Sequence, residues 1–373
     1  MTRVLIATTA GLGHLLPLLR LGRALRAHGA EVHWVVGPSR CAMLAAEGFD
    51  VTPGGLDERP RFAEYLRRHP EAAAISGPEK RRHGFAHMFG GVAAPAMAPD
   101  LLAAAEEWRP DVVVRDAAEL SAPLVAARLG VPCVVHAFGV PIPWDVATAV
   151  EPVLAPLWAE YGVPARPPAE YDVLYLDICP PLLDNGQAPP IPRRYVRPAE
   201  AVPAVPRDRP LVYVTFGTVF NTPDRLRAVV LESAAADVDV LVTIGADGDP
   251  AALGDLPPNV SVEGFVPQAE VLPRCSVVVS HGGSGTTFAA LAHGVPNVLL
   301  PQGADQFENA DRAAAAGAAV AFAAGPPPPG AITAAIRRVL EEPSYAAGAA
   351  RVAAGIAAMP GPDEAAAAVA ALR

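Results

Sequence analysis

Short runs of apolar, mostly β-branched residues alternate with alanine-rich stretches along the whole chain. Such runs are typical of strands buried on both faces, and the stretches between them predict helices. The predicted strands of the first half are Val4–Thr8, Val32–Val36, Asp111–Val114 and Cys133–Val135. Those of the second half are Leu211–Phe216, Val238–Ile244, Val260–Val262, Val277–Ser280 and Val298–Leu300. This alternation predicts an α/β fold with doubly wound parallel sheets.

A proline-rich segment, Arg197–Pro210, interrupts the pattern and has the composition of a semi-rigid connector. The chain has 373 residues, which is a length typical of two domains. We therefore predict two Rossmann-like domains facing a central cleft, one over residues 1–200 and one over residues 201–359. A second break at Met359–Pro362 precedes a short alanine-rich helix over residues 360–373.

Composition narrows the class of protein. Hydrophobic residues make up 51% of the chain and charged residues 18%, which excludes a disordered protein. The formal net charge of −10 argues against nucleic acid or an anionic membrane as the main partner. The four cysteines are far apart and form no CxxC pair, as expected of reduced thiols in the cytoplasm. Glycines and prolines interrupt the uncharged stretch 313–336, so we expect no membrane span.

The segment Ser280–Thr287 (SHGGSGTT) follows a predicted strand and begins a predicted helix. This arrangement directs backbone N–H groups and a helix dipole at an anion, and His281 adds a donor. The segment lacks the lysine of a P-loop, which argues against an ATPase. The plainer interpretation is a strand–helix corner capped by Ser284 or Thr286. The density of glycine, histidine and hydroxyl groups favours the anion site.

Three further loops follow predicted strands of the second half. Asp305 and Gln306 carry the donor and acceptor groups that suit vicinal sugar hydroxyls, although Asp305 is equally suited to capping a helix. Phe265 and Val266 lie in a loop that could hold a base by stacking or form a plain surface turn. Thr218 is a candidate phosphate donor. In open α/β sheets ligands bind beyond the carboxyl ends of the strands, where all these residues lie.

In the first half, His14 lies in the predicted loop after the first strand, and Asp116 follows the Asp111–Val114 strand. A histidine oriented by a carboxylate is a common general base near neutral pH. Each residue also has a structural interpretation, His14 as a helix-start residue and Asp116 as a cap. Glu119 is a second, lower-ranked carboxylate. The segment Gly11–Leu16 lacks the third glycine of a dinucleotide fingerprint, so a nicotinamide site is not expected.

Taken together, these motifs resemble the GT-B, family 1 glycosyltransferases of actinobacteria that decorate natural products such as polyketides. The resemblance rests on Ser280–Thr287, on Gly294-Val-Pro and on Leu300–Ala310 (LPQGADQFENA), and it covers essentially the whole chain. It implies an inverting, metal-independent hexosyltransferase in which His14 is the general base, Asp116 is its partner, and the final helix returns to the first domain. It also implies the donor contacts: His281, Gly283, Ser284, Gly285, Thr286 and Thr218 with the diphosphate, Phe265 and Val266 with the base, and Asp305 and Gln306 with the sugar.

One departure from the family bears on the donor. Plant relatives carry a glutamate that binds both ribose hydroxyls, and Ala289 occupies the matching position here. An apolar residue gives no preference for a 2′-hydroxyl, so we expect a TDP-sugar as co-substrate and no bound cofactor. The expected partner is a hydrophobic aglycone, and a homodimer is one assembly that the sequence allows. Candidate wall residues of the aglycone pocket, each equally suited to ordinary core packing, are Phe62, Met88, Phe89, Phe138 and Trp144.

Three alternatives remain open at this point. A catalytically silent homologue that assists a partner transferase would keep the nucleotide site without turnover. A nucleotide-sugar epimerase of the same fold would change the donor without an acceptor. Transfer to an activated aromatic carbon, in place of a hydroxyl, would use the same motifs.

Overall fold

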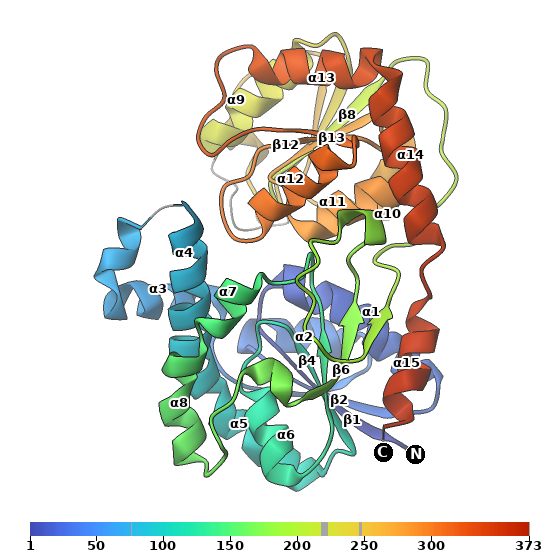
Figure 1. The fold of residues 1–373 in the computed structure, drawn as a ribbon. Helices are drawn as coiled ribbons and strands as arrows, with labels where there is room; N and C mark the ends of the chain where they lie inside the picture. Colours follow the sequence, from blue (N-terminus) through green and yellow to red (C-terminus); the bar gives the residue numbers. More distant parts are fainter. Residues whose placement is uncertain (76, 218–222, 246–247, 373) are drawn as a thin grey trace. The chain divides into compact units, whose positions relative to one another are not determined.

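A computed structural model describes residues 1–75, 77–217, 223–245 and 248–372. The chain forms two compact units, each with its own sheet (Figure 1). Unit 1 contains residues 1–178, 186–196 and 360–373, and unit 2 contains residues 179–185 and 197–359. The chain thus passes from unit 1 to unit 2 at Val196–Arg197, where the proline-rich segment begins, and the short segment 179–185 of the first half belongs to unit 2.

A seven-stranded parallel sheet with the order β3-β2-β1-β4-β5-β6-β7 forms the centre of unit 1. Ile6 of β1 pairs with Trp34 of β2 and with Val114 of β4, and all three side chains are fully buried. The strand order reverses between β1 and β4, and this is where ligands bind in such sheets. The strands are β1 Arg3–Thr8, β2 Glu31–Val36, β3 Asp50–Pro53, β4 Val112–Asp116, β5 Cys133–His136, β6 Asp172–Asp177 and β7 Arg193–Tyr195.

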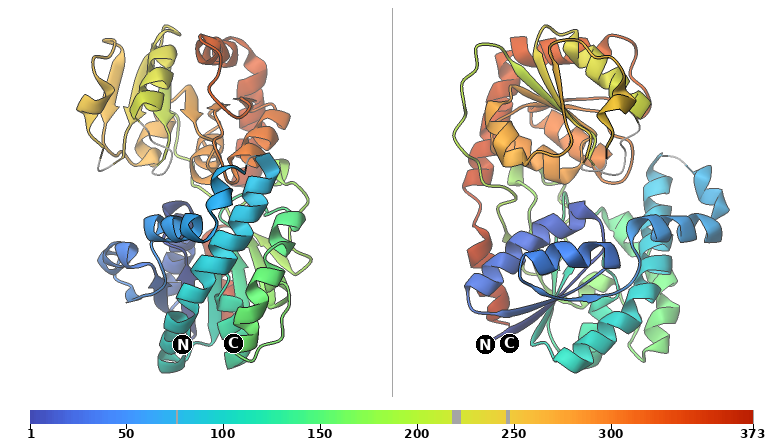
Figure 2. Two further views of the ribbon diagram at one scale, coloured as in Figure 1. Left: turned by 90° about the vertical axis from the view of Figure 1, so that its left-hand side faces the viewer. Right: turned by 180° about the vertical axis from the view of Figure 1, so that it is seen from behind.

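Helices cover this sheet on both faces (Figures 1 and 2). Helix α1 begins at Leu12, so His14 lies in the first helical turn and not in the predicted loop. The final helix α15 packs against α1 and buries Ala365, Ala366 and Val369. The helices of unit 1 are α1 Leu12–Ala27, α2 Pro38–Ala46, α3 Glu58–Arg68, η1 Pro70–Ala73, α4 Gly77–Gly84, η2 Phe85–Ala93, α5 Ala94–Trp108, α6 Ala122–Leu129, α7 Trp144–Thr148, α8 Glu151–Glu160, η3 Pro168–Glu170 and α15 Pro362–Ala370.

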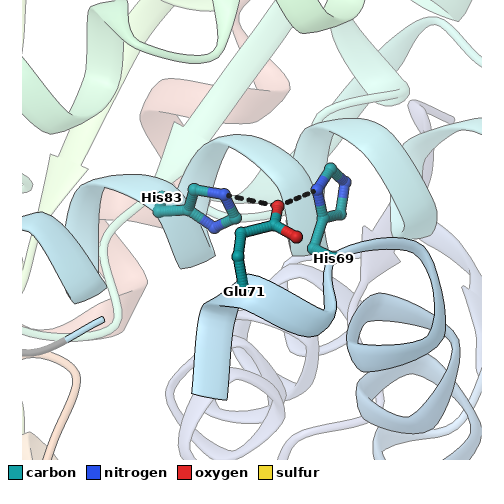
Figure 3. Close-up of side chains that lie close together, drawn as sticks. All are labelled: His69, Glu71 and His83. Atoms are coloured by element: carbon teal, nitrogen blue, oxygen red, sulfur yellow. Dashed lines mark hydrogen bonds and ion pairs between the residues drawn. The ribbon is translucent and has the colours of Figure 1, made fainter. Parts of the chain in front are cut away.

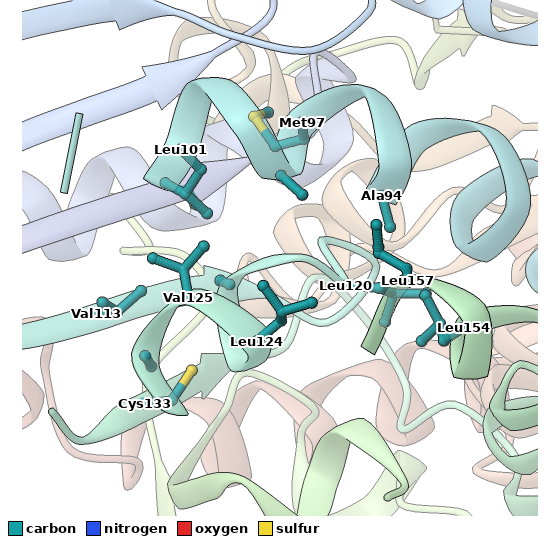
Figure 4. Packing of buried hydrophobic residues seen from close by; sticks show 14 of the residues in the cluster. Ala94, Met97, Leu101, Val113, Leu120, Leu124, Val125, Cys133, Leu154 and Leu157 are labelled. Carbon is teal, nitrogen blue, oxygen red and sulfur yellow. The ribbon is translucent and has the colours of Figure 1, made fainter. Parts of the chain in front are cut away.

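The core of unit 1 lies between α5, α6, α8 and the sheet. Met97 and Leu101 of α5 meet Leu124 and Val125 of α6 above Val113 of β4 (Figure 4). Helix α5 continues a helical stretch from Glu79 to Trp108 that is long and apolar enough to cross a membrane by length and composition alone. Because this stretch carries Met97 and Leu101, it occupies the position of a core helix. Its middle part, η2, is π-helical.

Unit 2 is built on a six-stranded parallel sheet with the order β10-β9-β8-β11-β12-β13. The order reverses between β8 and β11, as it does between β1 and β4 in unit 1. The strands are β8 Leu211–Thr215, β9 Asp239–Thr243, β10 Val260–Glu263, β11 Val277–Ser280, β12 Asn297–Leu299 and β13 Ala319–Ala321. The helices are η4 Pro181–Leu183, α9 Pro223–Ala234, η5 Pro250–Leu253, α10 Gln268–Val271, η6 Leu272–Arg274, α11 Ser284–Ala292, α12 Gln306–Ala315, α13 Ala331–Glu341 and α14 Pro343–Ala357.

The two parallel sheets confirm the predicted fold class. All nine predicted strands are present, with ends that shift by one or two residues. Four further strands, β3, β6, β7 and β13, are absent from the prediction. Strands β3 and β7 are short and largely polar, β13 is short and alanine-rich, and β6 begins and ends in aspartate. None of them is a continuous apolar run of the kind from which the other strands were predicted.

Candidate functional site

A histidine–aspartate pair lies at the reversal point of the unit 1 sheet. His14 Nδ1 lies 3.1 Å from Oδ1 of Asp116, the last residue of β4. The Asp116 side chain is completely buried, and that of His14 is 18% exposed. Because Nδ1 is held by the carboxylate, Nε2 is the nitrogen left to exchange a proton with a ligand. The structure thus brings together the two residues predicted to act as a general base and its partner.

Asp116 also closes the turn after its strand. Its Oδ2 accepts hydrogen bonds from Thr8 Oγ1 and from the backbone N–H of Thr9, both at 2.8 Å. Its Oδ1 accepts from the backbone N–H groups of Ala118 at 2.7 Å and Glu119 at 3.1 Å. Burial alone would raise the pKa of Asp116, but the charge of His14 and these hydrogen bonds outweigh burial and hold the pKa below its usual range. The carboxylate therefore stays ionised, so its capping role and its pairing with His14 coexist.

Glu119, the lower-ranked carboxylate, binds the start of α6. Its Oε1 accepts hydrogen bonds from the hydroxyl of Ser121 at 2.5 Å and from the Ser121 N–H at 3.1 Å, while its Oε2 accepts from the Ala122 N–H at 2.8 Å. These bonds satisfy the first N–H groups of α6. Glu119 is therefore a capping residue, and the geometry supports the ranking of Asp116 above it.

Arg115 holds the backbone of the turn that follows β4, and the sequence analysis did not predict this role. Its guanidinium forms a two-pronged ion pair with Asp172 of β6, with N···O distances of 2.6 and 3.1 Å, and both side chains are buried. Its Nη1 donates to the carbonyl oxygens of Asp116, Ala117 and Glu119 at 3.0–3.3 Å. A charged residue inside the apolar run of β4 was the available sequence signal, because buried arginines are almost always paired.

Two of the five candidate aglycone wall residues lie beside His14. The ring of Phe138 is 4.0 Å from the His14 ring, centre to centre, and that of Phe89 is 6.0 Å away. Both also pack against the main core of unit 1. These contacts place two aromatic rings next to the His14 ring.

The other three candidates lie elsewhere in unit 1. Met88 packs against a small cluster around Tyr65, and Phe62 is 52% exposed. Trp144 helps to line a separate cavity of about 70 Å³ together with Ile142 and Arg115. The structure therefore does not join all five residues into one wall.

In unit 2, the corner between β11 and α11 is shaped by glycines. Gly282 has a φ of +84°, a conformation that side chains disfavour. A Cβ on Gly283 would lie 2.6 Å from Nε2 of His281, so this glycine lets the imidazole lie against the start of α11. Burial lowers the pKa of His281, and the Asp305 charge and a hydrogen bond with the Thr215 backbone only partly oppose it. His281 is thus a neutral hydrogen-bonding group at a helix N-terminus.

Hydrogen bonds join this corner to the start of α12. The Ser284 hydroxyl donates to Asp305 Oδ2 at 2.6 Å. Asn309 Nδ2 donates to the same carboxylate oxygen at 3.0 Å, to Ser284 Oγ at 2.9 Å and to the Gly282 carbonyl at 2.9 Å. Neither Ser284 nor Asp305 forms a side-chain cap of its helix. The two predicted motifs are therefore one unit of structure, and Asn309, which was not predicted as a site residue, holds them together.

The remaining donor candidates differ in exposure. Gln306 is 3% exposed, and its Oε1 accepts from the N–H groups of Gln302 at 2.8 Å and Gly303 at 3.1 Å, so only its amide nitrogen is left for a sugar. Thr286 Oγ1 accepts from Gln268 Nε2 at 2.9 Å. A Cβ on Gly285 would meet open space.

The candidate base contacts lie close by in unit 2. Phe265 is 74% exposed. Val266 packs, together with Ala289, against a cluster around Leu272. Thr218 lies outside the described residues.

Comparisons with known proteins agree with this architecture. SsfS6, a glycosyltransferase of Streptomyces sp. SF2575 solved with thymidine diphosphate, matches with a TM-score of 0.81 and 28% identity over 99% of each chain. VinC, a glycosyltransferase solved with dTDP, matches with a TM-score of 0.79 and 27% identity over 99% of this chain and all of the other. Fold and site define a two-domain glycosyltransferase of the GT-B type.

Sequence comparison gives the family. Residues 227–372 match the C-terminal domain of the erythromycin biosynthesis protein CIII-like proteins, and residues 23–152 match the N-terminal domain. Elloramycin glycosyltransferase of Streptomyces olivaceus is 35% identical over 98% of this chain and 96% of its own length. L-demethylnoviosyl transferase of Streptomyces niveus is 34% identical over 84% of this chain and 83% of its own. The chain belongs to the erythromycin biosynthesis protein CIII-like family, and it is a hexosyltransferase.

Proposed function

We propose that this protein transfers a deoxyhexose from a TDP-sugar to a hydroxyl group of a hydrophobic natural-product aglycone, with inversion at the anomeric carbon. The observation that carries the proposal is the His14–Asp116 pair, because a histidine held by a buried, ionised carboxylate is suited to act as a general base in a family of glycosyltransferases. The names of the relatives support the proposal, since one is an elloramycin glycosyltransferase and another transfers a demethylnoviosyl group.

In the proposed step, Nε2 of His14 takes the proton of the acceptor hydroxyl. The oxygen then attacks the anomeric carbon as the bond from that carbon to the diphosphate breaks, and the electron pair leaves with TDP. Asp116 stabilises the imidazolium that forms. On the donor side, the N-terminus of α11 and the neutral His281 would stabilise the charge of the leaving diphosphate without a metal ion. Asp305 and the amide nitrogen of Gln306 would hold the sugar.

The preference for a thymine nucleotide is supported by two observations. Ala289 places a methyl group where plant relatives of the resembled family carry a ribose-binding glutamate, and it packs in the same cluster as Val266, the proposed base contact. SsfS6 and VinC were both solved with thymidine diphosphate. We expect TDP to bind more tightly than UDP. Ligand at about 100 times its Kd stabilises a protein by about 2.7 kcal/mol, enough for a shift of several degrees in a thermal unfolding assay.

The role of His14 is tested by His14→Ala. General-base assistance typically contributes about 10²–10⁴ in rate, so turnover of TDP-sugar with an acceptor should fall on that scale. The thermal shift with TDP should stay unchanged, because His14 belongs to unit 1 and the proposed donor residues belong to unit 2.

The matched control is His28→Ala, since His28 caps the other end of the same helix and its side chain is 43% exposed. This variant should keep the turnover and the thermal shift with TDP of the unaltered protein. Near-normal turnover by folded His14→Ala would assign the base to another residue. UDP binding as tight as TDP binding would remove the donor preference alone.

A further inference from the structure

Two imidazole nitrogens and a carboxylate oxygen come together where α3 turns into η1 and α4. His69 lies between α3 and η1, Glu71 lies in η1 and His83 lies in α4. Glu71 Oε1 is 3.1 Å from His69 Nδ1 and 3.7 Å from His83 Nε2 (Figure 3). His83 thus completes a small cluster of possible metal ligands.

The spacing of these atoms suits a tetrahedral metal ion. With metal–ligand bonds of about 2.0–2.1 Å, neighbouring ligand atoms of a tetrahedral zinc site lie about 3.3 Å apart. The two measured distances lie on either side of that value, and all three ligand atoms lie within 4.8 Å of one another. Side-chain rotations that draw the His69 and His83 nitrogens together around the ion would complete the geometry.

The environment of His83 resembles that of a metal ligand. The hydroxyl of Tyr65, a residue that is 5% exposed, lies 2.8 Å from His83 Nδ1. This bond orients the ring and leaves Nε2 directed at Glu71, as hydrogen bonds to the second nitrogen do for ligating histidines. The ring of His87 lies 4.3 Å from that of His69 and 4.4 Å from that of His83, centre to centre. His87 is therefore within reach of a fourth coordination position.

We propose that His69, Glu71 and His83 bind a divalent transition-metal ion of the zinc type. Imidazole nitrogens with one carboxylate select zinc and its neighbours over magnesium or calcium, which prefer oxygen ligands. The ion would tie the end of α3 to α4 and would take no part in the transfer step. Binding of the ion would therefore fix the position of α3, the helix that carries Arg61 and Phe62.

The test is calorimetric titration of the tag-free protein with ZnCl₂ in a non-chelating buffer. We expect one saturable site per chain, and we expect Co²⁺ in its place to give the visible absorption of a tetrahedral complex. Glu71→Gln and His83→Gln should each abolish both signals. Tyr65→Phe should weaken binding by about 10-fold, because it removes only the hydrogen bond that orients His83.

His28→Gln is the control, since this exposed histidine pairs with Asp363 away from the cluster. It should bind as the unaltered protein does. Glu71 is 57% exposed in its side chain, so Glu71→Gln should fold normally, which circular dichroism without metal will verify. Absence of a saturable site, or an unchanged affinity in Glu71→Gln, would overturn the proposal.

A different observation concerns Arg61 on α3. The residue is 5% exposed, and within the described chain its Nε is buried without a hydrogen-bond partner. Its guanidinium lies over the ring of Phe89, 4.9 Å from the ring centre. Glu58, Asp57 and Asp116 raise the pKa of this guanidinium, but burial lowers it further than they raise it. A buried cation of this kind costs free energy unless an anion compensates it.

The position of Arg61 indicates where such an anion would come from. Phe89, which the guanidinium covers, is also a neighbour of the His14 ring. A Cβ on Gly11, at the start of α1, would lie 3.0 Å from His14 and 3.2 Å from Glu58 Oε1, so the turn before His14 and the first turn of α3 are in contact. Arg61 thus belongs to the same wall of unit 1 as the proposed general base.

We infer that Arg61 recognises an acidic oxygen of the acceptor, such as a carboxylate, beside the hydroxyl that is glycosylated. This inference rests on the proposed function, because it assumes that the acceptor lies at His14. A guanidinium stacked on an aromatic ring can bind a carboxylate with two parallel hydrogen bonds and remain packed on the ring. Arg61 would therefore determine which aglycones bind, without exchanging a proton with them.

A pair of fluorescent naphthalenes tests this inference: 3-hydroxy-2-naphthoic acid and its methyl ester. Their binding to the protein is followed by the fluorescence of the probe, without any turnover. We expect the unaltered protein to bind the acid at least 10-fold more tightly than the ester. Arg61→Gln should bind both with the affinity of the ester, and Arg61→Lys should lie between, since lysine keeps the charge and loses the two-pronged geometry.

Tryptophan-detected urea unfolding serves as the folding control, because Arg61 and all four tryptophans lie in unit 1, and it should show one cooperative transition in all three proteins. Equal affinity of the unaltered protein for acid and ester, or a preference that survives in Arg61→Gln, would overturn the role of Arg61. The proposed function fails separately, if no TDP binding occurs or if His14→Ala turns over normally.

Discussion

At the scale of single residues, burial decides which groups carry charge. Asp116 and His136 are neighbours in the sheet of unit 1, at the ends of β4 and β5, and both are buried. Asp116 receives hydrogen bonds from His14, Thr8, Thr9, Ala118 and Glu119, so it remains ionised. His136 forms one hydrogen bond, from Nδ1 to the Ala137 carbonyl at 2.6 Å, and burial lowers its pKa to about 4.

His136 therefore makes the stability of unit 1 depend on pH. A histidine in the unfolded chain has a pKa of about 6.5, so the unfolded state takes up a proton first as the pH falls. The contribution to stability is complete above pH 6.5 and is lost between pH 6.5 and about pH 4. The total loss should be about 3 kcal/mol, at about 1.4 kcal/mol per pH unit.

The measurement is urea unfolding at several pH values, followed by tryptophan fluorescence. All four tryptophans lie in unit 1, so this signal reports unit 1 alone. His136→Leu should have a shallower dependence on pH than the unaltered protein, whereas the exposed His28→Gln should keep the original slope. Parallel slopes for His136→Leu and the unaltered protein would show that another group is responsible.

The sequence indicated individual site residues better than their surroundings. Asp116 and His281 follow apolar runs directly, so their places at strand ends could be predicted, whereas His14 and Asp305 lie a few residues further on, where helices begin. The sequence could not predict that Arg61 and His14 lie near the same Phe89 ring, because these residues come from different helices and nothing in their spacing specifies this. For the same reason, the cluster of His69, Glu71 and His83 became visible only in the fold.

At the scale of elements, the π-helical segment η2 determines how helices pack in unit 1. Gly90 lies in this segment, and a Cβ there would collide with a methyl group of Val150 at the start of α8. Gly91 lies next to Val153 in the same way, with 3.3 Å between the added Cβ and a valine methyl group. The glycines therefore permit the close approach of α8, and the widened helix carries Phe89 to its place beside His14.

Gly90→Ala is expected to destabilise unit 1 although alanine is the better helix former. The gain in helix propensity is about 1 kcal/mol, whereas overpacking a rigid contact costs about 1–3 kcal/mol, so the net loss should be about 1 kcal/mol. The double variant Gly90→Ala/Val150→Ala should recover most of the loss caused by Gly90→Ala, measured against Val150→Ala by tryptophan-detected urea unfolding.

Gly84→Ala is the matched control in the same helical stretch. The nearest atom to its added Cβ, the Tyr65 hydroxyl oxygen, is 4.0 Å away, so the variant should be as stable as the unaltered protein or more so. Additive effects of the Gly90 and Val150 substitutions would contradict the predicted clash.

The elements missed by the sequence share a physical cause. Strand β7 (RRY) is a polar edge strand, and β13 (AVA) carries alanines that favour a helix by propensity. Their structure depends on pairing with a neighbouring strand, which local sequence does not specify. The inner strands could be predicted because a strand that is buried on both faces is a continuous run of apolar residues, and loops do not have such runs.

At the scale of the whole molecule, the last helix completes the first unit. Helix α15 packs on α1 through Ala365, Ala366 and Val369, while Ala367 on the same helix is exposed. Burying these three side chains contributes about 3 kcal/mol. Val369→Asp should therefore destabilise unit 1 by about that amount, and Ala367→Asp by less than about 0.5 kcal/mol.

Tryptophan-detected urea unfolding measures the loss in unit 1, and the thermal shift with TDP reports unit 2. The TDP response should be unchanged in both variants. Equal stability of Val369→Asp and Ala367→Asp would show that α15 contributes little to unit 1.

The return of the chain to unit 1 also sets an order of events during synthesis. Residues 197–359 leave the ribosome as one stretch, and the earlier segment 179–185 is already present. Unit 1 begins earlier in the chain, but its helix α15 follows residue 359. The last segment of the unit that is translated first is therefore made after every residue of unit 2.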